Sequence, residues 1–158
     1  MGDKVVIYRK KVEHNLEESY KHLNRLNGAF DELGKVIHFP LNKKSFDTIV
    51  ASMQTMAYSD QIIYRFAKLQ DVMGVKLFKS VLVYQGENVN KPFLDLLNQL
   101  ELIEIVDVNE WFEIRDLRNE IAHDYEDNDA LSIDILNAIY KLKIELEHIL
   151  DAIKNMIS

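Results

Sequence analysis

The chain contains no cysteine and has few of the two residues that most often form turns. Of its 158 residues, 5 are glycine and 2 are proline. The lack of cysteine excludes disulfide bonds, thiolate nucleophiles and thiolate metal ligands. Sheet proteins of this size need many turns, so the shortage of glycine and proline predicts a few long helices. Repeats, low-complexity tracts and Ser/Gly linkers are also lacking, and we therefore expect a single domain over residues 1–158.

Long apolar runs are lacking as well. No stretch approaches the roughly 18 apolar residues that a membrane span needs. The first eleven residues, MGDKVVIYRKK, have too short an apolar run for a signal peptide. These patterns predict a cytoplasmic protein without membrane contact. The net charge of −7 argues against nonspecific coating of nucleic acid, so any contact with nucleic acid needs a local basic patch.

What the chain does have is apolar side chains at helical spacing. Steps of three and four residues mark five segments as amphipathic helices. The expected ranges are 4–33, 45–83 with a kink or break near Gly74, 92–103, 108 to about 123–126, and a last helix that opens after Asn128 or Asp129. Long amphipathic helices joined by short loops bury their apolar stripes best when they lie antiparallel. The sequence therefore predicts an all-α, up-and-down antiparallel bundle of four to five helices.

Polar residues that can do chemistry gather in segment 115–125, at the expected end of the fourth helix. Arg118 and Tyr125 are seven residues apart, so they share a face within about 20° if the helix continues that far. His123 is about 140° from Arg118 on a regular helix. The two side chains meet only if the last turn unwinds, if long side chains reach around the helix, or if a second copy brings them together. An imidazole can exchange protons near neutral pH, which makes His123 a candidate acid or base.

This segment resembles the HEPN superfamily, whose signature is an arginine, four to six residues, and then a histidine. Arg118, four residues, His123, one residue and Tyr125 match the pattern of HepT-like toxins, which are encoded beside a minimal nucleotidyltransferase antitoxin. A second stretch, RFAKLQD at 65–71 with GVKLF at 74–78, is similar to a segment of one branch of these proteins. The resemblance implies an all-helical bundle that forms a symmetric homodimer or a higher homo-oligomer.

The resemblance also implies a metal-independent ribonuclease with RNA, not DNA, as its substrate. His123 would move a proton, Arg118 would bind the phosphate, and Asn119 would orient a phosphate oxygen or His123. Tyr125 matches the residue to which the partner nucleotidyltransferase transfers AMP. A bulky anion there would exclude RNA by occupancy and charge repulsion. No cofactor and no metal site are expected.

Other interpretations of these residues stay open. Arg118 and His123 could simply cap a helix end, and Tyr125 could be an interface aromatic. Asp60 and Asp71 interrupt the apolar stripe, either because the stripe drifts and both face solvent or because one of them orients Arg118. We favour Asp71, since it lies in the second resembling stretch.

Two further functions compete with the nuclease. The chain could be a non-catalytic helical subunit that binds substrate or nucleotide for a minimal nucleotidyltransferase, with Arg118 holding a phosphate. It could also be a purely structural bundle whose match to the motif is accidental.

Overall fold

The computed structural model describes residues 2–126 and 128–158, and all of the secondary structure in these ranges is helical. The elements, in chain order, are α1 (Gly2–Leu33), α2 (Lys43–Val50), α3 (Met53–Val72), the π-helical segment η1 (Met73–Leu77), α4 (Phe78–Tyr84), α5 (Phe93–Leu102), α6 (Val108–Asp124) and α7 (Asp129–Ile157). The predicted all-α fold is confirmed. Within the described ranges, no helix is long and apolar enough to cross a membrane.

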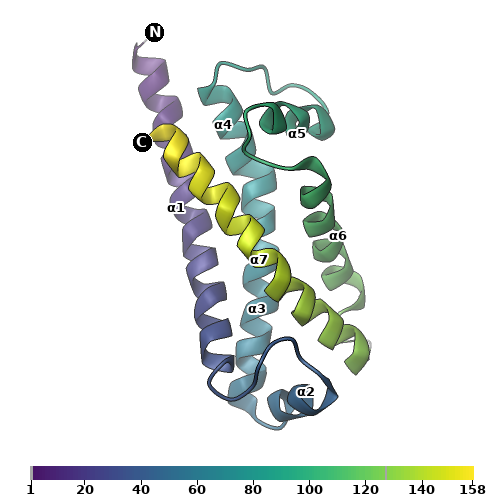
Figure 1. The fold of residues 1–158 in the computed structure, drawn as a ribbon. Coiled ribbons are helices and arrows are strands. Elements are labelled where there is room, and N and C mark those ends of the chain that lie inside the picture. The colour runs from purple at the N-terminus through teal and green to yellow at the C-terminus, as the bar shows by residue number, and fades with distance from the viewer. Residues whose placement is uncertain (1, 127) are drawn as a thin grey trace.

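Successive long helices run in opposite directions (Figure 1). Helix α1 runs down the molecule, α3, η1 and α4 return up it, α6 runs down again, and α7 crosses the others obliquely on the way back. The short helices α2 and α5 lie at opposite ends of the bundle. The up-and-down topology agrees with the sequence prediction, although the oblique α7 departs from simple antiparallel packing.

Every helix contributes to one cluster of buried apolar side chains. On α1 the buried stripe starts at Val12 and continues to Leu33. Val5, at the start of the predicted stripe, is instead 52% exposed, as are its neighbours Val6 and Ile7 to similar extents. The first turns of α1 therefore extend past the core and leave apolar side chains in solvent.

The expectation of one helix over 45–83 was wrong near its start. The helix is interrupted at Ala51 and Ser52, which separate α2 from α3. Ser52 has an extended backbone, and its hydroxyl accepts a hydrogen bond from the Gln54 amide to cap α3. The Thr55 hydroxyl donates a hydrogen bond to the Ile49 carbonyl at the end of α2. Satisfying both helix ends in this way makes the break favourable.

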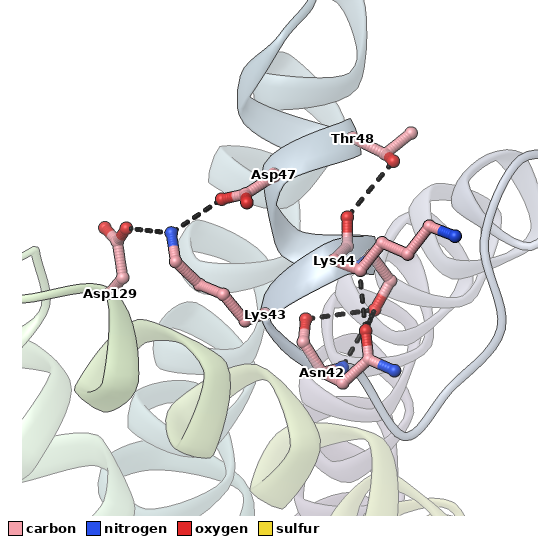
Figure 2. A network of polar contacts seen from close by, with 7 residues as sticks. Asn42, Lys43, Lys44, Asp47, Thr48 and Asp129 are labelled. Carbon is pink, nitrogen blue, oxygen red and sulfur yellow. Dashed lines mark hydrogen bonds and ion pairs between the residues drawn. The ribbon is translucent and has the colours of Figure 1, made fainter.

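Helix α2 also starts two residues earlier than predicted, at Lys43. Asn42 is its N-cap, and the side chains of Asn42 and Ser45 cap each other's backbone amides reciprocally. Next to this cap, Lys43 Nζ lies 2.6 Å from Asp47 and 2.8 Å from Asp129 (Figure 2). These exposed ion pairs are individually weak, but they join the start of α2 to the start of α7.

The irregularity expected near Gly74 is the π-helical segment η1. The Phe78 amide donates to the Met73 carbonyl, five residues back, which is the hydrogen bond of a π-helix. A Cβ on Gly74 would lie 3.2 Å from Cζ2 of Trp111, so the absence of a side chain lets α6 pack closely here. Val75 and Lys76, in the same segment, point outward and are exposed.

Side-chain caps begin the last two helices. Asp107 accepts from the Glu110 amide at 2.9 Å at the start of α6, and Asn128 accepts from the Leu131 amide at 2.8 Å at the start of α7. Such caps fix the register of a helix. The register of α6 in turn determines where the segment 115–125 lies.

Candidate functional site

Arg118 on α6 is bound by Asp71 on α3 through two hydrogen bonds. Arg118 Nε donates to Oδ1 and Nη2 donates to Oδ2 of Asp71, both at 3.1 Å. This fork geometry fixes the plane of the guanidinium. The side chains are 28% and 43% exposed, so solvent and a ligand can still reach the remaining donors. The structure thus brings Asp71 to Arg118, as the second resembling stretch suggests.

The Arg118–Asp71 pair lines an open pocket of about 440 Å³, which we call the arginine pocket. It is formed by α3, η1, α5 and α6, and its lining residues are Gln70, Asp71, Gly74, Val75, Phe93, Arg115, Arg118, Asn119 and Ala122. With two guanidinium groups and one carboxylate, the pocket carries an excess of positive charge, although the chain as a whole is acidic. The pocket is therefore suited to an anion such as a phosphate.

The second arginine of this pocket, Arg115, was not singled out from the sequence. Its guanidinium lies 5.6 Å from the centroid of the Phe93 ring, which places it over that ring. The spacing of three residues to Arg118 could have indicated a shared helix face. Phe93 comes from α5, and no local pattern links it to α6.

His123 does not line the arginine pocket in a single copy of the chain. It is exposed in the last turn of α6, and the helix stays regular as far as Asp124. The last turn therefore does not unwind to bring the imidazole to Arg118. Of the three routes that the sequence left open, this leaves long side chains reaching around α6 or a second copy that supplies the other group.

Tyr125 lies beyond the end of α6, and its backbone is extended, with a φ of −61° and a ψ of 132°. The condition for it to share a face with Arg118, a continuing helix, is therefore not met. Tyr125 instead lines a different pocket, of about 190 Å³, together with Ser59 and Asp60 on α3 and Asp129 on α7. We call it the tyrosine pocket. Burial, followed by the charges of Asp60 and Glu126, raises the pKa of Tyr125 to about 12, although a hydrogen bond with Ser59 opposes the shift.

Asp60 and Asp71 therefore do not share one environment. Asp60 is exposed and lines the tyrosine pocket, whereas Asp71 binds Arg118. Asn119, the residue that follows Arg118 in the sequence, is exposed and also lines the arginine pocket. Arg118, Asn119 and Asp71 thus form one group, His123 lies beside it on the same helix, and Tyr125 lies in a second pocket.

Comparison of the chain with protein-family models, with curated proteins and with solved structures finds no match. The all-α fold and the geometry of the two pockets are therefore the observations on which a functional proposal rests.

Proposed function

We propose that the chain is a HepT-like toxin, a metal-independent endoribonuclease that acts through Arg118 and His123. The observation that carries the proposal is the guanidinium of Arg118, fixed in plane by Asp71 and facing an open pocket of positive balance. The motif of Arg118, four residues, His123, one residue and Tyr125 on an all-helical chain supports it. A fixed guanidinium with free donors binds a phosphodiester with little loss of side-chain entropy.

In this chemistry the RNA 2′-hydroxyl attacks the adjacent phosphorus. A bond from O2′ to phosphorus forms, the bond from phosphorus to O5′ breaks, and the products carry a 2′,3′-cyclic phosphate and a 5′-hydroxyl. His123 moves a proton, either from the 2′-hydroxyl or to the leaving 5′-oxygen. Arg118 stabilises the negative charge that develops on the phosphate oxygens, and Asn119 donates a further hydrogen bond.

The separation between His123 and the arginine pocket favours a site shared by two copies. Two α6 helices related by a two-fold axis would place His123 of one copy at the arginine pocket of the other. We therefore propose a homodimer in which each cleft takes residues from both chains.

Tyr125 serves regulation in this proposal. A partner nucleotidyltransferase would form a bond between the tyrosine oxygen and the α-phosphate of ATP, with pyrophosphate leaving. The Tyr125 hydroxyl keeps its proton at neutral pH, as a tyrosine does, and burial raises its pKa further. The transfer therefore needs a base, which we assign to the partner enzyme. We expect the intact mass of the chain to gain one or more AMP units on co-expression with the adjacent gene. Tyr125→Phe should lose this gain, and an unchanged gain in that variant would contradict the assignment.

The nuclease itself is tested with purified protein and RNA. His123→Ala should lower the cleavage rate by a factor of about 100 or more, since general acid–base catalysis contributes at least that much. His38→Ala is the matched control, because His38 is exposed in the loop between α1 and α2 and lines neither pocket. Equal cleavage by the wild type and His123→Ala would refute the proposal.

One observation favours the second function, a non-catalytic subunit that binds nucleotide. The arginine pocket has the volume of a small-molecule site, and His123 does not reach it within one chain. In that case calorimetry detects nucleotide binding that depends on Arg118, while RNA stays intact.

A further inference from the structure

A second groove lies next to the arginine pocket, between α1 and the π-helical segment with α4. Its volume is about 490 Å³, and it is lined by Tyr8, Lys11, Asn15, Val75, Lys76, Lys79, Ser80, Val83 and Val89. We call it the lysine groove. Val75 lines both this groove and the arginine pocket, so the exposed ridge of η1 is their common border. The two hollows are therefore neighbours.

The lysine groove carries three positive charges, and the described residues that line it include no carboxylate. One of the three lysines has an acidic partner, since the Glu18 carboxylate lies 3.6 Å from Lys76 Nζ. Lys11 and Lys79 are both exposed. In a chain with a net charge of −7, three lysines and two arginines against the carboxylates of Glu18 and Asp71 leave a local excess of positive charge, as nucleic-acid binding needs.

Negative charge gathers in a different pocket of the molecule. A pocket formed by the end of α5, the start of α6 and α7 is lined by Glu101, Glu104, Asp107, Glu110 and Glu145, with His148 among them. Burial and the neighbouring Glu145 raise the pKa of Glu110 to about 7, which reflects the crowding of negative charge. The chain therefore separates its charges, and a polyanion is steered toward the side with the lysine groove.

The lining of the groove matches single-stranded RNA. Tyr8 offers an aromatic face, and Val75, Val83 and Val89 offer apolar surface to an unstacked base. The buried Asn15 side chain donates to the Lys76 carbonyl and the Ser80 hydroxyl, which keeps α1 and α4 in register across the groove. A double-stranded helix would present phosphates but no free bases to these groups.

We infer that the lysine groove binds the RNA strand next to the scissile phosphate, with Lys11, Lys76 and Lys79 at its phosphates and Tyr8 stacked on a base. This inference rests on the proposed function and extends it. The strand crosses the Val75 ridge from the arginine pocket into the groove. The substrate class is thus single-stranded RNA long enough to span both hollows.

The test uses the full chain and a fluorescent single-stranded RNA with a 2′-O-methyl group on every nucleotide, which cannot be cleaved by 2′-hydroxyl attack. The double variant Lys11→Gln/Lys79→Gln should bind this probe about 25-fold more weakly at 0.1 M salt. The slope of log affinity against log salt should fall by about 1.4, because each phosphate contact contributes about 0.7 for a single strand. Tyr8→Leu should lower the affinity at least about fivefold, and Tyr8→Phe should restore it.

The matched control is Lys44→Gln/Lys141→Gln, which makes the same charge change at exposed positions of α2 and α7. The inference is overturned if both double variants weaken binding equally, or if the groove variant binds like the wild type. It is also overturned if polyglutamate displaces the probe as well as RNA of equal charge does, since the groove would then fit acidic peptides.

Failure of the nuclease and failure of the groove are distinguishable. If the wild type cleaves no RNA but binds the probe through Lys11 and Lys79, the nuclease proposal fails and the groove stands. If cleavage requires Arg118 while the groove variant binds the probe normally, only the groove inference fails.

Discussion

We expect Asp71→Asn to lower the proposed RNA cleavage rate by about 100-fold while leaving the fold intact. Asp71 binds Nε and Nη2 of Arg118 at 3.1 Å, and an asparagine offers only one oxygen to these two donors. The guanidinium then loses its fixed plane, and a misplacement of about 1 Å at a reacting group costs about that factor. The pair is partly exposed, so its contribution to the free energy of unfolding is small.

The rate is measured as kcat on a defined RNA, beside thermal unfolding of the same preparation. Asp116→Asn is the control, because Asp116 is exposed on α6 and does not line the arginine pocket. Arg118→Lys should not restore activity, since an ammonium cannot make the two parallel bonds. A wild-type kcat in Asp71→Asn, or an equal loss in Asp116→Asn, would argue against a positioning role.

Trp111→Ala destabilises the protein by about 3–5 kcal/mol, the range typical of a large aromatic removed from a core. Trp111 is fully buried, and its ring meets the Phe78 ring edge-on at a centroid distance of 4.6 Å. The indole also packs against Gly74. Removing it leaves a cavity beneath η1, the segment that borders both basic hollows. The loss is a large part of the 5–15 kcal/mol that stabilises a typical domain.

Urea unfolding followed by circular dichroism measures this effect, since Trp111 is the only tryptophan and its removal abolishes the fluorescence signal. Leu102→Ala is the control: Leu102 is 83% exposed, and its truncation should change the free energy of unfolding by no more than about 0.5 kcal/mol. If the free energy of unfolding of Trp111→Ala is within about 1 kcal/mol of the wild-type value, the core beneath the arginine pocket is not packed as described.

The helical fold could be predicted because apolar spacing reports the face that each helix buries. This signal found α1, α6 and α7. It missed the break at Ser52, because the apolar stripe continues from Val50 to Met53 and Met56 across the gap. A single hydroxyl that caps a helix changes the backbone without changing the hydrophobic period.

The candidate site was predictable only in part. The relation of Arg118 to Asp71 followed from two resembling stretches, and the structure places them together. Tyr125 was extrapolated along a helix that ends at Asp124, after which Glu126 adopts a φ of 78° and redirects the chain. Other helices supply Phe93 to the arginine pocket and Lys11 and Tyr8 to the lysine groove. Only the folded structure shows that these residues lie near α6 or η1.

The most direct test of the central claim is the chemistry of the RNA ends. Mass spectrometry of fragments made in the presence of EDTA should find a 2′,3′-cyclic phosphate on one product and a 5′-hydroxyl on the other. These ends follow when the 2′-hydroxyl attacks with Arg118 and His123 as the only catalysts, and they should be lost in His123→Ala. Fragments that end in a 3′-hydroxyl and a 5′-phosphate, or cyclic ends formed equally well by His123→Ala, would contradict the account.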